Sequence, residues 1–263
     1  MKYALITGAS SGIGLEYARQ LAAEGWNLIV VSNRAEENIR VAEELSRQYG
    51  VAVEPLYADL TDADAAEKIY ERTKALGADI EVLINNAGML LFSTLCNTRT
   101  ESLEHIIALH CTTPTKLCRL FADDMCKRGR GHILIMSSIT AWTPYPTISH
   151  YAATKAYLHS FAQSLWYELR RRGVSVTAVY PSAVDTPFYD LDDKMRRLLL
   201  RCGVMLSAES VACKGLGAMF RGRRRCLPGL LTKLSAAACS IFPPCVLLAV
   251  MKLPAIKRIL ERV

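Results

Sequence analysis

The sequence predicts a single α/β domain, built on a doubly wound parallel sheet of about seven strands with a helical cap at its C-terminal end. Short apolar runs alternate with segments of helical length through residues 1–188, as successive βαβ units require. A glycine-rich turn joins the first apolar run to the first helical segment. The 263 residues, 51% apolar and 22% charged, fit one globular domain with a substantial core.

The expected elements follow one another in a regular order. Apolar runs bounded by turn residues predict strands over residues 3–7, 27–31, 51–57, 81–84, 132–136 and 174–180, with a short seventh near Cys226 and Leu227. Amphipathic segments predict helices over residues 15–23, 36–49 and 64–76, a helix through Tyr151 that ends at Leu169, and later helices over 189–202 and 208–220. Residues 1–188 are therefore assigned to a nucleotide-binding and catalytic core, and residues 189–263 to a substrate cap and helical extension of the same domain.

The turn after the first strand reads Gly8-Ala-Ser-Ser-Gly12-Ile-Gly14. Glycines between a buried strand and a helix let backbone amides approach a pyrophosphate, and the helix N-terminus adds positive potential. A glycine-rich turn without a ligand is the alternative. We expect cofactor contacts from the residues of this turn, namely Gly8, Ser10, Ser11, Gly12, Ile13 and Gly14.

Three polar residues between Ser138 and Lys155 have the types needed for proton transfer. Tyr151 and Lys155 are four residues apart, so on a helix they share one face. A nearby cation favours the phenolate, and a tyrosine tuned in this way can give a proton to a carbonyl or take one from an alcohol. Ser138 follows the apolar run 132–136, where its hydroxyl could hold the same substrate oxygen.

These motifs together resemble the short-chain dehydrogenase/reductase family. The resemblance is carried by the Thr-Gly-x-x-x-Gly-x-Gly turn at Thr7, by Asn85-Asn86-Ala87-Gly88, and by Ser138 with Tyr151-x-x-x-Lys155, and it fades after residue 188. It implies a Rossmann fold, a nicotinamide cofactor, and catalysis by Ser138, Tyr151 and Lys155. It also implies cofactor contacts from Asp59, Leu60, Asn86, Ala87, Gly88, Tyr151, Lys155, Pro181, Val184 and Thr186.

The end of the second strand bears on the choice of cofactor. An acidic residue there selects NAD, whereas a missing acid with a nearby arginine suits a 2′-phosphate. The sequence has Ser32, Asn33 and Arg34 at this place. We expect NADP(H), with contacts from Asn33 and Arg34; a solvated charge at a helix start is the other reading of Arg34.

His110 is the main departure from the family pattern, because it stands where an asparagine is expected. Pro114 lies four residues later and cannot donate the helical hydrogen bond to the carbonyl of His110. The resemblance implies that this carbonyl could hold a water that connects to the catalytic lysine. His110 is thus a candidate catalytic residue, through its backbone or by proton transfer from its imidazole. Ser182, where the family usually has glycine, is a milder departure.

The C-terminal segment differs in composition from the core. Residues 190–263 hold 14 Lys and Arg against 5 Asp and Glu, although the whole chain has a net charge of +7. Residues 234–251 are uncharged but contain Pro243-Pro244, which breaks a helix. A helical cap fits best, with peripheral membrane contact through a basic surface and a true anchor as alternatives.

The nine scattered cysteines include no C-x-x-C pair, so we expect buried thiols in a reducing cytoplasm and neither a disulfide framework nor a metal site. The strand-like start leaves no room for a signal peptide. No nucleic-acid motif is present.

The sequence therefore predicts an NADP(H)-dependent oxidoreductase that moves a hydride between the nicotinamide and a ketone or secondary alcohol on an apolar substrate, steroid-like or long-chain acyl. The resemblance implies a homodimer or homotetramer. A 3-oxoacyl-[acyl-carrier-protein] reductase is an alternative, for which the basic C-terminal segment could meet an acidic carrier. A non-catalytic NADP(H)-sensing Rossmann protein is the alternative from another class.

Overall fold

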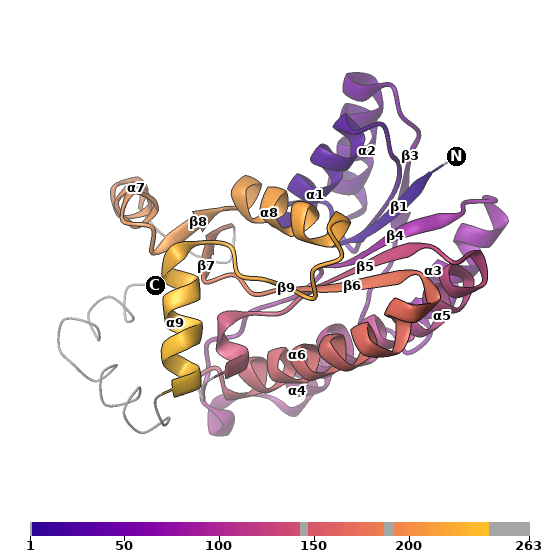
Figure 1. Cartoon of the computed structure of the whole chain (residues 1–263). Helices are drawn as coiled ribbons and strands as arrows, with labels where there is room; N and C mark the ends of the chain where they lie inside the picture. The colour runs from indigo at the N-terminus through magenta and orange to yellow at the C-terminus, as the bar shows by residue number, and fades with distance from the viewer. Residues whose placement is uncertain (1, 143–146, 187–191, 242–263) are drawn as a thin grey trace.

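The computed structural model describes residues 2–142, 147–186 and 192–241. Its centre is a parallel sheet of seven strands in the order β3-β2-β1-β4-β5-β6-β9 (Figure 1). The strands are β1 (Tyr3–Thr7), β2 (Asn27–Ser32), β3 (Val53–Tyr57), β4 (Ile80–Asn85), β5 (Gly131–Met136), β6 (Val174–Val179) and β9 (Arg225–Cys226). The order reverses beside β1, so the sheet is doubly wound as predicted.

Helices cover both faces of this sheet (Figure 1). One face packs against α1 (Gly12–Ala23), α2 (Ala35–Tyr49) and α8 (Ala208–Phe220), and the other against α3 (Ala65–Ala75), α5 (Thr113–Arg128) and α6 (Ser149–Leu169). The remaining helices and short turns are η1 (Leu95–Asn97), α4 (Thr100–Ile107), η2 (Ala108–Thr112), η3 (Ile139–Trp142), η4 (Arg170–Arg172), α7 (Asp193–Arg201) and α9 (Leu230–Ile241).

The sheet is buried on both sides, which explains the apolar runs in the sequence. Along β2, Leu28 and Val30 face the core beneath α1 and α2, whereas Ile29 and Val31 face the core beneath α3 and α5. All four side chains are fully buried. A strand covered on both faces needs continuous apolar residues and not an alternating pattern.

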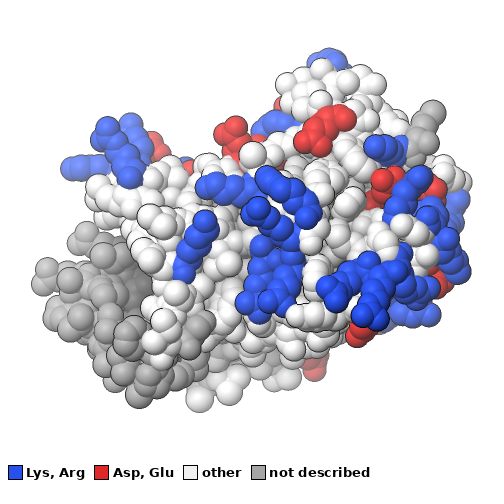
Figure 2. All heavy atoms as spheres, viewed as in Figure 1, with Lys and Arg blue, Asp and Glu red and all other residues white. Residues whose placement is uncertain are grey.

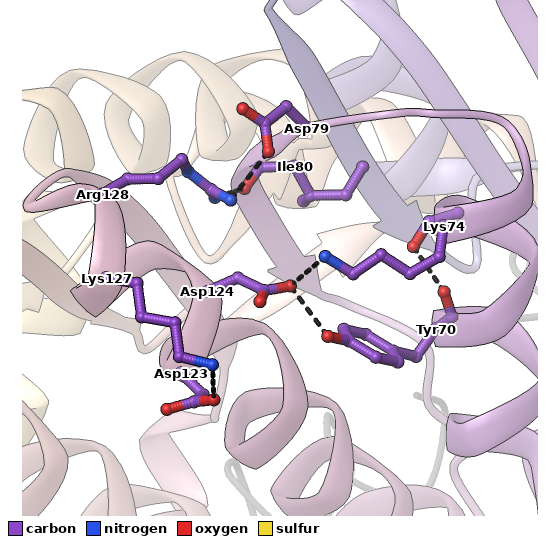
Figure 3. A network of polar contacts seen from close by, with 9 residues as sticks. Tyr70, Lys74, Asp79, Ile80, Asp123, Asp124, Lys127 and Arg128 are labelled. Atoms are coloured by element: carbon purple, nitrogen blue, oxygen red, sulfur yellow. Dashed lines mark hydrogen bonds and ion pairs between the residues drawn. The ribbon is translucent and has the colours of Figure 1, made fainter.

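A polar network holds α3 against α5 at the edge of the core beneath these two helices (Figure 3). The Asp124 carboxylate accepts hydrogen bonds from the Tyr70 hydroxyl at 2.9 Å and from the Lys74 ammonium at 2.6 Å. Nearby, Arg128 donates to Asp79 at 2.8 Å and to the carbonyl of Ile80 at 2.6 Å. These bonds fix the end of α5 to the start of β4.

Two features were not predicted from the sequence. A second parallel sheet pairs β7 (Ala183–Asp185) with β8 (Met205–Ser207). It was missed because each strand is too short to show a periodicity in the sequence. A π-helical turn, η2, joins α4 to α5 at the position of His110.

The C-terminal segment is partly described. Helix α8 has its predicted bounds, and β9, which begins at Arg225 and ends at Cys226, adds a seventh strand to the core sheet close to its predicted place. Pro243 and Pro244 lie outside the described residues. Within the part of the chain that the structure describes, no helix is long and apolar enough to cross a membrane.

The expectation that the cysteines are buried is wrong for part of the set. Cys118 and Cys226 are buried, but Cys96, Cys202 and Cys213 are exposed.

Candidate active site

A cavity of about 770 Å³ lies where the carboxyl ends of the core strands meet their following loops. This is the edge at which open α/β sheets bind their ligands. The predicted site residues that line it are Gly8, Ser10, Ser11, Gly12, Ile13, Asn33, Arg34, Asp59, Leu60, Asn86, Ala87, Gly88, Ser138, Tyr151, Lys155, Pro181, Val184 and Thr186. The other two predicted residues, Gly14 and His110, lie behind this lining and are buried.

The glycine turn between β1 and α1 can only be built with glycines. Gly8 and Gly12 have φ values of +68° and +56°, in the left-handed region that side chains disfavour. A Cβ atom on Gly14 would collide with the carbonyl oxygen of Gly8 and lie 2.6 Å from Nδ2 of Asn86. The turn therefore presents bare backbone to the cavity, as a bound pyrophosphate requires.

Thr7 and Asn86 hold this turn against the loop that follows β4. The Thr7 hydroxyl accepts hydrogen bonds from the amides of Asn86 and Ala87, both at 3.0 Å, and Nδ2 of Asn86 donates to the Thr7 carbonyl at 2.9 Å. The role of Asn86 is thus to join two strand ends. Thr7 was not predicted as a site residue, although a hydroxyl at the end of a buried strand was its visible signal.

The far end of the cavity is polar and includes the guanidinium of Arg34. Ser32 and Ser10 share a hydrogen bond of 2.9 Å between their hydroxyls, and the amide of Arg34 donates to the Ser32 hydroxyl at 3.1 Å. The Arg34 side chain lines the cavity, is exposed, and has no carboxylate partner within the described residues. This geometry suits an additional phosphate, because arginine binds phosphate with paired, charge-assisted hydrogen bonds.

Lys155 is buried at the opposite end, with 4% of its surface exposed. Its ammonium donates a hydrogen bond to the carbonyl of Met136 at 2.9 Å and lies 5.5 Å from the ring centre of Tyr151. Burial lowers the pKa of Lys155 to about 8. The Ser137 hydroxyl donates to the Lys155 carbonyl at 2.8 Å, so β5 and α6 are joined next to the site.

Ser138 and Tyr151 face the same cavity from different elements. Ser138 follows β5 and is buried, and its hydroxyl oxygen accepts a hydrogen bond from the amide of Thr140 at 3.2 Å. Tyr151 lies in the first turn of α6, one turn before Lys155. The arrangement brings a hydroxyl, a phenol and an ammonium to one end of the cavity, as the sequence predicted.

The wall around this end is apolar, and only its part from the predicted substrate cap, Leu199, Val204 and Met205, was expected from the sequence. It is formed by side chains from loops and short elements, namely Leu90, Phe92, Leu109, Ile139, Ile148, Leu199, Val204 and Met205. These residues are scattered over the sequence and follow no motif. Helix α9 packs behind η3, and its Thr232 hydroxyl lies 3.1 Å from the Ser182 hydroxyl, so the C-terminal segment supports this wall.

Comparisons with known proteins identify the family of the chain. Residues 2–196 match the sequence profile of the short chain dehydrogenases. The chain is 34% identical over 200 residues to 17-beta-hydroxysteroid dehydrogenase type 3 of Mus musculus, covering 74% of this chain and 65% of that protein. It is also 34% identical over 188 residues to very-long-chain 3-oxoacyl-CoA reductase of Phaeosphaeria nodorum, covering 70% of this chain and 55% of that protein. The chain thus spans less than two thirds of the length of these relatives.

Solved structures extend the similarity beyond residue 196. A short-chain dehydrogenase from Sphingobium yanoikuyae in complex with NADPH superposes with a TM-score of 0.79 at 29% identity, covering 92% of this chain and 97% of that one. The bulky-bulky ketone specific alcohol dehydrogenase from Comamonas testosteroni gives a TM-score of 0.77 at 27% identity, covering 92% and 95%. The chain therefore belongs to the short chain dehydrogenase family.

Proposed function

We propose that this protein is an NADP(H)-dependent oxidoreductase acting on a ketone or secondary alcohol of an apolar substrate. The observation that carries the proposal is the placement of Ser138, Tyr151 and Lys155 at one end of a cavity whose other end is a glycine cradle. A nicotinamide dinucleotide spanning this cavity would supply or accept the hydride.

The residues of the chain would then manage the proton and the substrate oxygen. In the reductive direction the Tyr151 hydroxyl donates its proton to the carbonyl oxygen, while the Ser138 hydroxyl holds that oxygen by a hydrogen bond. Lys155, with a pKa of about 8, is largely charged at pH 7. Its charge stabilises the phenolate that Tyr151 becomes.

The preference for NADP(H) rests on Arg34. It stands two residues after β2, is exposed and lines the cavity, and neither Ser32 nor Asn33 before it carries an acid that would repel a 2′-phosphate. The solved relatives with NADPH and NADP bound support this assignment.

The apolar wall supports a bulky apolar substrate. The relatives are named for hydroxysteroid and very-long-chain 3-oxoacyl-CoA chemistry, and either substrate class would bury an extended apolar surface. A 3-oxoacyl-[acyl-carrier-protein] reductase remains the alternative, because Arg223, Arg224 and Arg225 could meet an acidic carrier. The non-catalytic NADP(H) sensor is the weaker alternative, since the proton-transfer residues are complete.

The test is NADPH oxidation against a panel of steroid ketones, 3-oxoacyl thioesters and small ketones, with Tyr151→Phe as the matched variant. We expect one apolar class to be reduced, and Tyr151→Phe to lower turnover by about a hundredfold or more without loss of NADPH binding. If the variant keeps more than about a tenth of the activity, the proton comes from another group. Activity with none of the ketones would favour the sensor.

We also propose peripheral contact of the C-terminal segment with an anionic lipid surface. Figure 2 shows Lys and Arg gathered over α8, β9 and the end of α6 with few carboxylates among them. On α9, Leu230 and Leu234 are 73% and 58% exposed. Binding to vesicles with anionic lipid, but not to neutral vesicles, would support this contact. If the protein binds to neither kind of vesicle, the contact is refuted. Oligomerisation and a cytoplasmic location stay predictions.

A further inference from the structure

His110 stands where the family has asparagine, and both of its ring nitrogens make hydrogen bonds in the structure. The imidazole is buried, with 1% of its surface exposed, and lies behind Gly88 and Met89. Its Nε2 atom accepts a hydrogen bond from the amide of Met89 at 3.0 Å. Its Nδ1 atom lies 2.8 Å from the hydroxyl oxygen of Thr154.

These contacts fix the protonation state of the ring. The amide of Met89 can only donate, so Nε2 must present its lone pair. Thr154 donates its own hydroxyl proton to the carbonyl of Tyr151 at 2.8 Å, and its oxygen is therefore an acceptor for an Nδ1 proton. Only a neutral imidazole with its proton on Nδ1 satisfies the three bonds at once. An imidazolium would aim a second N–H at the amide of Met89.

The surroundings oppose a positive charge as well. Burial, the ammonium of Lys155 and the ring of His150 all lower the pKa of His110 well below its ordinary value. The ring of Tyr151 packs edge-on against the imidazole, with 5.6 Å between the ring centres. Among the described residues, no carboxylate makes an ion pair with His110.

We propose that His110 is a positioning residue, a neutral imidazole that ties the loop after β4 to the helix that carries Tyr151 and Lys155. One end holds Met89, whose neighbours Ala87 and Gly88 line the cofactor cavity. The other end acts through Thr154 on the first turn of α6, where Tyr151 lies. A methyl on Gly88 would lie 3.0 Å from Nε2, so the glycine leaves room for the imidazole. This proposal deepens the proposed function and rests on it for its kinetic part only.

The two halves of the tie can be separated by substitution. The amide of an asparagine occupies the place of Nδ1, so His110→Asn keeps a donor for Thr154 and loses the acceptor for Met89. The longer glutamine reaches the place of Nε2, so His110→Gln keeps an acceptor for Met89 and loses the donor for Thr154. We expect His110→Asn to weaken NADPH binding about three- to tenfold, and His110→Gln chiefly to lower kcat by a similar factor.

His132→Asn is the matched control, because His132 also bonds a hydroxyl, that of Ser175 at 2.7 Å, but lies outside the cavity. It should alter thermal stability and leave both NADPH affinity and kcat unchanged. If His110→Asn and His110→Gln change NADPH affinity and kcat in the same proportion, the residue is only a packing group and the tie is refuted.

Thr154→Val tests the transmission to Tyr151. If His110 acts through Thr154, the double variant His110→Gln with Thr154→Val should have a kcat no lower than that of the more impaired single variant. Fully additive losses would overturn this part of the proposal.

A measurement without catalysis decides the protonation state. Nitrogen-15 spectra of the five histidines, with His110→Asn used to assign the signals, should show one neutral ring protonated on Nδ1 that does not titrate between about pH 5.5 and 8. Titration of His110 within that range, or a proton on Nε2, would overturn the proposal. Because this experiment and NADPH affinity need no ketone, they remain decisive even if the proposed activity fails.

Discussion

Lys155→Met should make the coenzyme-free protein more stable while removing its activity. The lysine is buried, and its ammonium donates a hydrogen bond to the carbonyl of Met136. The depression of its pKa from 10.5 to about 8 corresponds to about 3 kcal/mol of unfavourable free energy for the charged form at pH 7. Methionine fills the same volume without a charge, although it gives up a hydrogen bond of about 1 kcal/mol.

The expected net gain is therefore about 2 kcal/mol, or about 4–8 °C in the unfolding midpoint of a domain of this size. The sign of the pH dependence follows from proton binding. Between pH 8 and 10.5 the unfolded lysine binds more protons than the folded one, so the stability of the unmodified protein rises with pH in this window. The advantage of the variant should shrink toward zero by about pH 9.5–10.

Thermal unfolding of the coenzyme-free protein at pH 7 and at pH 9.5 would measure this effect, with Lys116→Met as the control. The Lys116 side chain is 38% exposed and donates to the carbonyl of Ala63 and to Glu67, so its replacement should give no stabilisation and little change with pH. If Lys155→Met is less stable than the unmodified protein at pH 7, or if the difference in stability does not depend on pH, the folded protein compensates the buried charge of Lys155 and the prediction is wrong.

The other predictions use different parts of the molecule. NADPH should bind at least about tenfold more tightly than NADH, and Arg34→Ala should reduce that ratio; equal dissociation constants in the unmodified protein would reject the assignment. Asp124→Asn should lower the free energy of unfolding by about 1–3 kcal/mol near pH 7. Burial raises the pKa of Asp124, but the hydrogen bonds from Lys74 and Tyr70 outweigh this and lower it below its ordinary value. The stability lost in Asp124→Asn should therefore fade as the pH drops below about 4, which denaturant titrations at pH 7 and 3.5 would show. Pro114→Ala should lower turnover more than His110→Asn does, in parallel assays of the two single variants.

The sequence was sufficient for the parts of the site that lie next to one another along the chain. The glycine turn, Asn86 to Gly88, and Tyr151 with Lys155 each belong to one segment, and their chemistry depends on local spacing. Their assembly follows from the parallel sheet, which brings the carboxyl ends of all its strands to one edge. The bounds of α8 match the prediction, and in the structure the Ser207 side chain accepts a hydrogen bond from the amide of Ser210 at the helix start, while Gly222 follows its end.

The parts that could not be predicted depend on contacts between distant segments. Leu90 in the loop after β4, Leu199 on α7 and Met205 on β8 become one wall only when these separate segments meet at the cavity. Thr154 lies between Tyr151 and Lys155 and was given no role from the sequence, but its hydroxyl links His110 to the backbone of Tyr151. No periodicity marks such residues, since each makes a single contact that the rest of the fold creates.

The π-helical turn at Ala108–Thr112 connects the sequence argument about Pro114 with the structure. Proline at 114 has no amide for the carbonyl four residues earlier, which belongs to His110. The turn widens there, and the amide of Thr113 donates to the carbonyl of Ala108, five residues back. Pro114→Ala restores a donor that can draw this turn into a regular α-helix, which would move the His110 backbone and its ring together. His110→Asn leaves the widened turn in place and alters only the side-chain tie, so the proline should be the more sensitive position.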